Sequence, residues 1–353
     1  MKVAGTIVEY NPFHNGHLYQ LKKIKEISKC DCLVVVMSTY FTMRGDISVH
    51  NPYDKCKYAL SEADIVIALP ATLAVNSAEY FAYYACRELN KVGVTDLYFG
   101  SEDNDITKYE LLYNNKDIDI KESLKNGESY KRAHNLDILP NDLLGYCYYK
   151  AIKDNNYNIK CHTIKRIGSQ HGEVSPNDDT YTSSSAIRSN SDLLRNYAPH
   201  FVSNTFYDYN KLFNYLKYFL LVNKDYENIR FIDEGIHNLI IKNINTSINF
   251  NELLDRCANK RYTKSRIKRA IFHLLINDLR IDDDYPYTKI LGFNARGKEY
   301  LNTIKKNIKL ITNNKNGICN ILDNEIILAK LIDLVYNDDK LKYELNGPVI
   351  KGC

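Results

Sequence analysis

The sequence of 353 residues has no tryptophan, no Cys-x-x-Cys motif and no apolar run long enough to cross a membrane. Its nine cysteines are an odd number spread along a long chain, which argues against a disulfide framework or a zinc site. The apolar residues 3–8 are followed at once by Glu9 and two histidines, which is unlike a signal peptide. We therefore expect reduced thiols in a cytoplasmic protein that does not bind a membrane.

The composition otherwise fits a globular protein, with 44% hydrophobic and 25% charged residues. A chain of this length can bury a large core. The net charge of +4 says little by itself, so the distribution of charge along the chain matters more. No internal repeat or low-complexity linker is present, and nothing predicts a protein partner.

Short apolar runs alternate with helical patterns in the first part of the chain. Strands are expected at residues 3–8, 32–37, 65–69, 96–99 and 159–167, and helices at 16–28, 53–62, 78–90, 143–152 and from about 186. Continuous Val, Ile and Leu runs are typical of strands that are buried on both faces. The pattern predicts an α/β fold with a Rossmann-like, doubly wound parallel sheet.

The pattern changes along the chain. Residues 101–140 are polar and read as an insertion, and residues 168–181 read as a long loop. From about residue 205 strand-like runs vanish, and amphipathic helical patterns follow at 212–222, 267–279 and 326–335. We therefore expect a catalytic domain at residues 1–200 and a mainly α-helical C-terminal domain at residues 201–353.

The strongest local signal is His14-Asn15-Gly16-His17, directly after the first strand. In a doubly wound sheet, ligands bind at the carboxyl ends of the strands. A helix that begins there offers free N–H groups and a positive dipole end to a phosphate. Two imidazoles three residues apart can donate to phosphate oxygens that gain charge during displacement. We expect His14 and His17 to be catalytic, and the alternative is a pair of surface or capping histidines.

A second signal, Thr182 to Arg188, follows the last predicted strand at a helix start. The Ser184 hydroxyl and the Arg188 guanidinium could hold the β- and γ-phosphates of a nucleotide. The alternative is an ordinary serine-rich N-cap.

Together these motifs resemble the nucleotidyltransferase superfamily with a His-x-Gly-His signature. Further stretches are similar to the bacterial tRNA(Met) cytidine acetate ligase family. They lie, in order, at residues 8–17, 74–82, 99–103, 139–145, 164–167, 260–266 and 291–294.

The resemblance implies that acetate attacks ATP to give acetyl-adenylate, and that the wobble cytidine of elongator tRNA(Met) then takes the acetyl group. ATP is thus the expected nucleotide substrate, accompanied by Mg²⁺. The family's ATP contacts map onto Ile7, Val8, Glu9, Tyr10, Asn11, Pro12, Phe13, His14, Asn15, Gly16, His17, Leu18, Tyr19 and Gln20, and onto Gly100, Asn141 and Arg166.

The loop after the second strand departs from the family pattern. Where relatives carry Gly, Asn and Gln, this chain has Thr39, Tyr40 and Met43, although Arg44, Gly45 and an acidic residue remain. The departure suggests one alternative, an inactive, nucleotide-gated RNA-binding homologue. A second alternative is an adenylyltransferase for a small molecule, which would keep both motifs but would not need a basic helical domain.

A cluster of basic residues occurs in the second half of the chain. A helix with apolar residues at i, i+3, i+4, i+7 and i+8 from Ile267 would bury one face and present the basic one. Such a face attracts an RNA backbone, and a tyrosine can stack on a base, although a solvated charged face is the alternative. The residues expected to contact tRNA are Lys260, Arg261, Tyr262, Lys264, Arg266 and Arg269.

Overall fold

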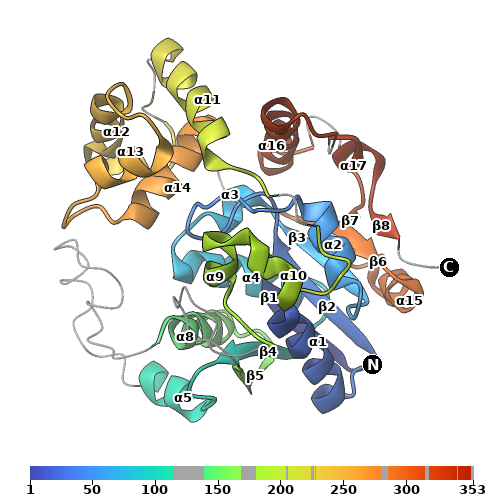
Figure 1. Ribbon diagram of the computed structural model, residues 1–353. Helices are drawn as coiled ribbons and strands as arrows, with labels where there is room; N and C mark the ends of the chain where they lie inside the picture. Colours follow the sequence, from blue (N-terminus) through green and yellow to red (C-terminus); the bar gives the residue numbers. More distant parts are fainter. Residues whose placement is uncertain are drawn as a thin grey trace.

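Five parallel strands form the centre of the fold, as the sequence predicts. They are β1 (Val3–Val8), β2 (Cys32–Ser38), β3 (Ile65–Leu69), β4 (Asp96–Ser101) and β5 (Lys160–Lys165). Their order in the sheet is β5-β4-β1-β2-β3 (Figure 1). The computed structural model describes residues 1–114, 139–167, 180–203, 206–223, 226, 228–279, 285–314, 318–339 and 341–350.

Helices cover both faces of this sheet, which confirms the doubly wound α/β class. One face packs against α1 (Asn15–Ser28), α2 (Pro52–Ala59), α9 (Ser184–Ser189) and α10 (Leu194–Tyr197). The other face packs against α3 (Ala71–Ala74), α4 (Ala78–Lys91), α5 (Thr107–Asn114) and α8 (Pro140–Asp154). Alternate residues of β2 enter the two cores, and all seven are buried. This explains why its sequence is continuously apolar rather than alternating.

A second apolar cluster lies among four helices from the later part of the chain. These are α11 (Tyr209–Val222), α12 (Ile236–Ile244), α13 (Phe250–Cys257) and α14 (Lys264–Leu275). They lie together at the upper left of Figure 1, to one side of the sheet. Amphipathic spacing correctly indicated helices here, since each helix buries one face against the others.

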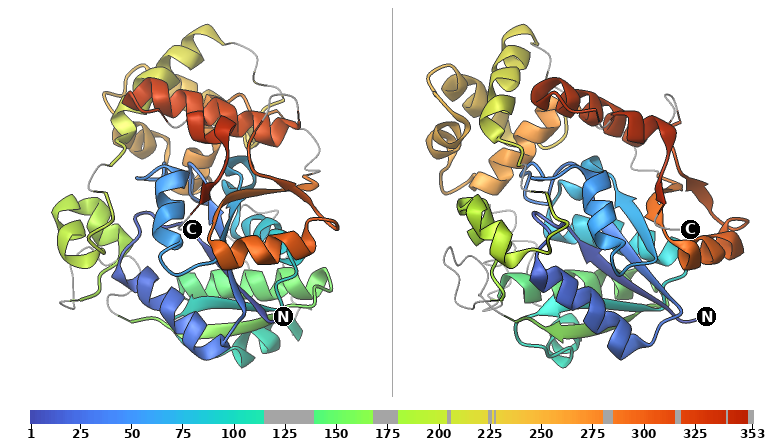
Figure 2. Two further views of the ribbon diagram at one scale, coloured as in Figure 1. Left: turned by 90° about the vertical axis from the view of Figure 1, so that its right-hand side faces the viewer. Right: turned by 45° about the vertical axis from the view of Figure 1, so that its right-hand side comes forward.

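The expectation that strands vanish after residue 205 is wrong. Three further strands, β6 (Tyr287–Phe293), β7 (Lys309–Ile311) and β8 (Val349–Ile350), extend the sheet, and β6 pairs antiparallel with β3. Their connections are α15 (Ala295–Ile304), α16 (Asn320–Tyr336) and α17 (Leu341–Asn346). Figure 2 shows α15, in orange, beside the added strands and α16, in dark red, near the top of both views. The interval 201–353 is thus mostly helical, but it divides between the helical cluster and the end of the sheet. The boundary near residue 200 stays a prediction.

One buried charge explains why β6 escaped the sequence analysis. Lys289 lies in the middle of β6 and is 2% exposed. Its ammonium group donates to Asn314 Oδ1 at 3.0 Å and lies 3.4 Å from Glu344 Oε2. A lysine in an apolar run argues against a buried strand unless such distant partners are known.

Two expected segments lie largely outside the described residues, namely most of the insertion at 101–140 and most of the loop at 168–181. Within the described ranges, no helix is both long enough and apolar enough to cross a membrane.

Candidate active site

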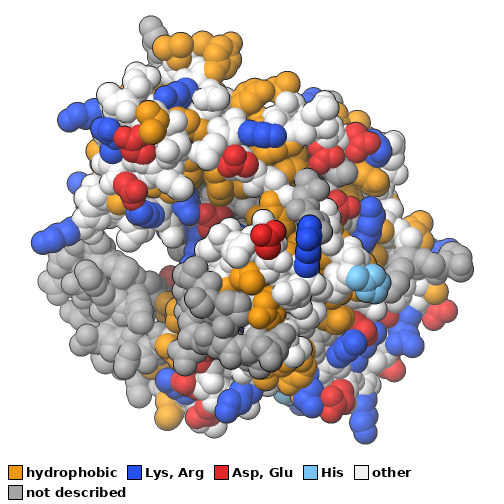
Figure 3. Space-filling view, viewed as in Figure 1, with side chains coloured by type: hydrophobic (Ala, Val, Ile, Leu, Met, Phe, Trp, Pro, Cys, Tyr) orange, Lys and Arg blue, Asp and Glu red, His pale blue; other side chains and the backbone are white. Residues whose placement is uncertain are grey.

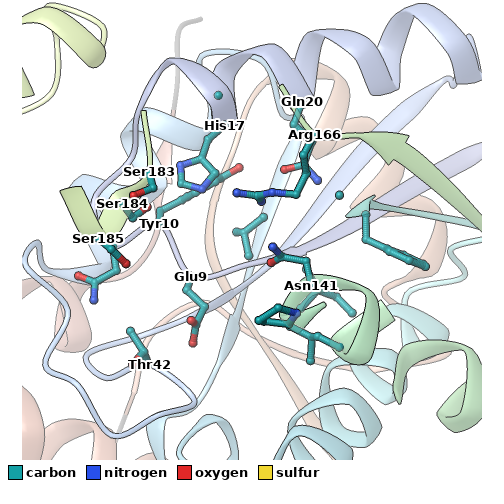
Figure 4. Close-up of a pocket in the computed structure, with 18 of the residues that line it drawn as sticks. Glu9, Tyr10, His17, Gln20, Thr42, Asn141, Arg166, Ser183, Ser184 and Ser185 are labelled. Carbon is teal, nitrogen blue, oxygen red and sulfur yellow. The ribbon is translucent and has the colours of Figure 1, made fainter. Parts of the chain in front are cut away.

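A cavity of about 410 Å³ opens where the carboxyl ends of β1, β4 and β5 meet the starts of α1 and α9. Figure 4 shows the His17 ring and the Arg166 guanidinium pointing toward each other across it, with Ser183, Ser184 and Ser185 along one wall. This is the edge of a doubly wound sheet at which ligands bind. The predicted site residues that line the cavity are Ile7, Val8, Glu9, Tyr10, Asn11, His14, Gly16, His17, Tyr19, Gln20, Gly100, Asn141, Arg166, Ser184 and Arg188.

Four residues of the predicted stretch do not line the cavity, so their contacts with ATP stay a prediction. Phe13 is fully buried in the core beneath α1, and Leu18 packs against the same core. The Asn15 amide donates to the carbonyl of Thr180 at 3.2 Å, and the Pro12 carbonyl accepts from the Ser184 hydroxyl at 3.5 Å. A strand-loop-helix turn must fix its own backbone before it can present a ligand site, and these residues do so.

The two histidines cap α1 and line the cavity at the same time. His14 Nδ1 accepts from the Gly16 N–H at 3.1 Å, and His17 Nδ1 accepts from the His14 N–H at 3.3 Å. The rings stack with centroids 3.8 Å apart. Because each Nδ1 is an acceptor, each neutral ring carries its proton on Nε2. The capping role is therefore correct, and it leaves both Nε2–H groups as donors.

The surroundings keep both rings neutral. Burial lowers the pKa of His14 to about 3, with Arg166 and Arg188 adding to the effect. Burial also lowers the pKa of His17 well below its ordinary value, together with His14 and Arg166. The first turn of α1 carries no acidic residue, so its dipole end is not neutralised by the chain. The site thus offers neutral donors, guanidinium groups and a helix N-terminus to an anion.

The serine-rich turn is likewise both a cap and a cavity wall. The Ser183 hydroxyl accepts from the Ala186 N–H at 3.0 Å and begins α9. Arg188 donates to the carbonyl of Asn11 and, at 3.2 Å, to the Ser185 hydroxyl. α9 is therefore tied to the loop that precedes His14, although residues 11 and 188 are far apart in the sequence.

An aspartate that the sequence analysis did not single out organises the opposite wall. Asp142 is fully buried and accepts from Ser101, from the Tyr109 hydroxyl at 2.7 Å and from the Glu102 N–H at 3.2 Å. Burial pushes the pKa of Asp142 up, but the hydrogen bonds from Ser101 and Tyr109 hold it below its ordinary value. Asp142 thereby fixes the turn after β4 next to the cavity. Asp142 belongs to the stretch at residues 139–145 that resembles the family, but the sequence did not show what this residue does.

Asn141 and Arg166 meet at one carboxylate. The Asn141 amide donates to Glu102 Oε1, and Arg166 Nε lies 3.9 Å from the same oxygen. A Cβ on Gly100 would meet only the Arg166 side chain, at 3.4 Å. The backbone at Gly100, which the resemblance places among the ATP contacts, is therefore approached closely by Arg166 of the same chain.

Two of the three positions at which the loop differs from the family pattern do not face the cavity. Thr39 and Tyr40 are buried, and the Tyr40 hydroxyl donates to Glu344 Oε1 at 2.9 Å. Thr42, Met43, Arg44 and Asp46 line the cavity instead. Of the three altered positions, only Met43 reaches the cavity, and its backbone N–H donates to Glu9 Oε1 at 2.6 Å. The departure therefore changes mainly how the loop is anchored.

This loop also contacts the helical cluster. Gly45 has φ of 81°, and a Cβ there would lie 2.7 Å from the backbone nitrogen of Arg269 in α14. The Tyr209 hydroxyl donates to the Gly45 carbonyl at 3.0 Å, and Lys268 forms an ion pair with Asp46. The cavity loop therefore lies directly against the predicted RNA-binding helix. Glycine is needed here because of both the left-handed backbone and the close helix.

Several residues of the basic cluster have acidic partners. Arg261 and Arg266 lie 3.2 and 3.1 Å from Glu234 Oε2, and Lys264 pairs with Asp255. Figure 3 shows such blue and red side chains next to each other over the α12–α14 part of the surface. Exposed pairs of this kind contribute little and are screened by salt, so a phosphate backbone can replace the acidic partner. Lys260 is exposed.

Two members of the cluster do not fit the predicted role. Tyr262 is 6% exposed, its hydroxyl donates to the carbonyl of Glu234 at 2.7 Å, and the guanidiniums of Arg261 and Arg266 lie over its ring. The Tyr262 ring is thus covered within the chain and supports the two arginines, and its stacking on a base stays a prediction that this arrangement does not favour. Arg269 lies over the Phe231 ring at 5.9 Å. Its pKa is lowered to about 10, mainly by burial and further by the nearby charges of Arg266 and Arg44.

The chain matches the model of the HIGH Nucleotidyl Transferase family over residues 1–346. A tRNA(Met) cytidine acetate ligase from Caldicellulosiruptor saccharolyticus is 38% identical, with 88% of this chain and 87% of the relative covered. A tRNA(Met) cytidine acetate ligase from Staphylococcus aureus is 32% identical, with 99% of both chains covered.

Solved structures show the same fold over nearly the whole chain. Thermotoga maritima TmcAL without ligand superposes with a TM-score of 0.88 at 26% identity, with 99% of both chains covered. Thermotoga maritima TmcAL with bound alpha-thio ATP superposes with a TM-score of 0.84 at 25% identity and the same coverage.

The capping contacts predict the protonation of both imidazoles. We expect His14 and His17 to carry their proton on Nε2 and to remain neutral from pH 8 down to pH 5, because burial depresses both pKa values. Long-range ¹H–¹⁵N NMR of histidine-labelled protein measures this directly, with His14→Asn and His17→Asn variants for assignment. A site imidazole that titrates near the ordinary histidine pKa would contradict the prediction.

Proposed function

Because the chain belongs to the tRNA(Met) cytidine acetate ligase family of HIGH nucleotidyltransferases, we propose that it uses ATP and acetate to acetylate the wobble cytidine of elongator tRNA(Met). The observation that carries the proposal is the pair of neutral, stacked imidazoles at the N-terminus of α1, which line a cavity with Arg166 and Arg188. ATP, acetate and tRNA all occur in the cytoplasm, where we place the protein.

In the first step, an acetate oxygen attacks the α-phosphorus of ATP and pyrophosphate leaves, giving acetyl-adenylate. Negative charge builds on the non-bridging oxygens during this displacement. The Nε2–H groups of His14 and His17 donate to those oxygens, and they need no protonation change to do so. Arg166, Ser184 and Arg188 hold the β- and γ-phosphates, which become the leaving pyrophosphate.

Mg²⁺ accompanies the nucleotide in this proposal. The ion would be held mainly by phosphate oxygens and water, as is usual when Mg²⁺ binds together with a triphosphate, and it would neutralise phosphate charge. Within the described residues, no group of three His, Cys, Asp or Glu side chains could hold a metal by itself. Asp103 pairs with Lys108, and Asp105 accepts from Thr107, so the acids after β4 are engaged with the chain.

In the second step, the exocyclic amine of the cytidine attacks the acetyl carbon and AMP leaves. The tRNA approaches along α14, because the cavity loop lies against that helix at Gly45 and at the Asp46–Lys268 pair. The contacts proposed for the phosphate backbone are Lys260, Arg261, Lys264 and Arg266. Arg269 instead supports the loop from the cluster side.

The first prediction concerns the imidazole donors. We expect His17→Asn to lower acetate-dependent pyrophosphate release by about 100-fold or more, because one preorganised donor to the transition state is lost. The asparagine carbonyl can still accept from the His14 N–H, so the melting temperature should change little. His200→Asn, at an exposed position, is the matched control and should retain full activity. A His17→Asn enzyme with normal turnover would reject the assignment.

The second prediction concerns the basic cluster. We expect Lys260→Ala with Lys264→Ala to weaken tRNA binding and to reduce the slope of log Kd against log salt by about two, since two phosphate contacts disappear. Acetate-dependent pyrophosphate release without tRNA should not change. Glu234→Gln removes the acidic partner of Arg261 and Arg266 and should therefore tighten tRNA binding. A cluster with only a structural role would not bind tRNA more tightly after this change. Loss of both activities in the lysine variant would indicate misfolding instead.

A further inference from the structure

Glu9 has one engaged and one free carboxylate oxygen at the cavity. It follows the last residue of β1, and its Oε1 accepts from the Met43 N–H at 2.6 Å. Within the described part of the chain, no donor reaches Oε2, and the side chain is partly exposed where it lines the cavity. Figure 4 shows the carboxylate pointing away from the His17 ring and toward Thr42. One oxygen thus fixes the side chain, and the other can serve a substrate.

The histidines cannot act as bases in the second step. Each Nδ1 accepts a backbone N–H, and each Nε2 already carries a proton. A base has to receive the proton that the amine loses, and strongly depressed basicity makes these imidazoles poor acceptors. They stabilise phosphate charge without exchanging protons.

Asp46 is the other acidic side chain among the described cavity residues. It forms an ion pair with Lys268 and lies 3.4 Å from the Tyr209 hydroxyl through the same oxygen, Oδ1. The ion pair with Lys268 neutralises the Asp46 charge and holds the side chain at the junction with the helical cluster, which makes Asp46 a weak base. Glu9 has one oxygen held by a backbone N–H and forms no ion pair among the described residues, so it is the better candidate for a base at the cavity.

We propose that Glu9 is a catalytic residue of the acetyl-transfer step, in which its Oε2 accepts the proton that the cytidine amine loses. This assignment rests on the proposed function and names a residue role within it. A carboxylate is also a suitable recognition group, because the cytidine N4 amine is a hydrogen-bond donor.

The step balances without any further reactant. The N4 lone pair forms a bond to the acetyl carbon of acetyl-adenylate, and the bond from that carbon to the AMP oxygen breaks. AMP leaves with the electron pair of that bond. One N4 proton passes to Glu9 and then to solvent, leaving an amide on the cytidine. The amine is weakly nucleophilic because its lone pair is delocalised into the ring, so removal of the proton assists the attack.

The surroundings of Glu9 make its carboxylate more basic than that of an ordinary glutamate. Burial raises the pKa of the Glu9 carboxyl, while the Met43 N–H, Lys55 and Arg44 lower it and Asp46 raises it. Arg188 of α9 and Tyr148 of α8 also interact with it. The Lys55 ammonium donates to three carbonyls, those of Glu9, Ser38 and Thr39, at 2.7 to 3.0 Å. It therefore holds the backbone of Glu9 and leaves the carboxylate free.

Transfer from chemically prepared acetyl-adenylate isolates this step. Enzyme, acetyl-adenylate and tRNA are mixed in a single turnover between pH 5 and pH 9, and acetylcytidine is quantified by mass spectrometry. The wild-type rate should fall with decreasing pH as Glu9 takes up a proton, because only the carboxylate can act. Glu9→Gln keeps an acceptor for the Met43 N–H, so the fold should survive. We expect the Glu9→Gln enzyme to transfer acetyl at least about 100-fold more slowly. Its rate should also lack the acid limb, which is the fall in rate with decreasing pH.

The outcomes separate the two proposals. If wild-type enzyme fails to acetylate tRNA from acetyl-adenylate, the proposed function fails. If Glu9→Gln transfers at the wild-type rate or keeps the same acid limb, the role of Glu9 is overturned. If Glu9→Gln transfers normally from acetyl-adenylate but shows a raised acetate KM in a separate pyrophosphate-release assay, Glu9 acts in the first step and the proposal is likewise overturned. Should Glu9→Gln not fold, Glu9→Asp replaces it, and an acid limb at an unchanged pH would overturn the proposal.

Discussion

The reciprocal cap formed by His14 and His17 is the contact on which the site depends. It satisfies the backbone N–H groups at the start of α1 with the Nδ1 atoms of two stacked rings. The same contacts decide the tautomer, and burial beside two arginines decides the charge. The helix therefore begins with neutral N–H donors rather than with acidic side chains. A site built in this way can stabilise phosphate charge, but its histidines cannot serve as the base of the acetyl-transfer step. This is why we assign that role to Glu9.

The loop at residues 39–47 joins the two halves of the proposed reaction. Its Met43 N–H fixes Glu9 inside the cavity, and its Gly45 backbone touches α14. Tyr40 reaches in the opposite direction, to Glu344 near the end of the chain. The cavity and α14 are therefore connected through this loop by direct packing. The substitutions in this loop change its anchoring, and they leave most of the surface that faces the cavity in place.

How much the sequence could predict follows from the distance over which each signal acts. Apolar runs and the His-x-Gly-His motif are local, so the five parallel strands and the site at their carboxyl ends could be predicted. The strand β6 could not, because burial of Lys289 depends on Asn314 and Glu344. The role of Asp142 could not be predicted either, because it depends on hydrogen bonds from Ser101 and Tyr109, which are distant in the sequence. A tyrosine within a basic segment is typical of a residue that stacks on a base, and the sequence does not show that two guanidiniums cover the Tyr262 ring.

The most direct measurement is a crystal structure of this protein with a non-hydrolysable ATP analogue. The account predicts phosphate oxygens within about 2.7–3.2 Å of Nε2 of both His14 and His17, with each Nδ1 still accepting its backbone N–H. Phosphates bound elsewhere, or rings turned so that Nδ1 faces the nucleotide, would contradict it.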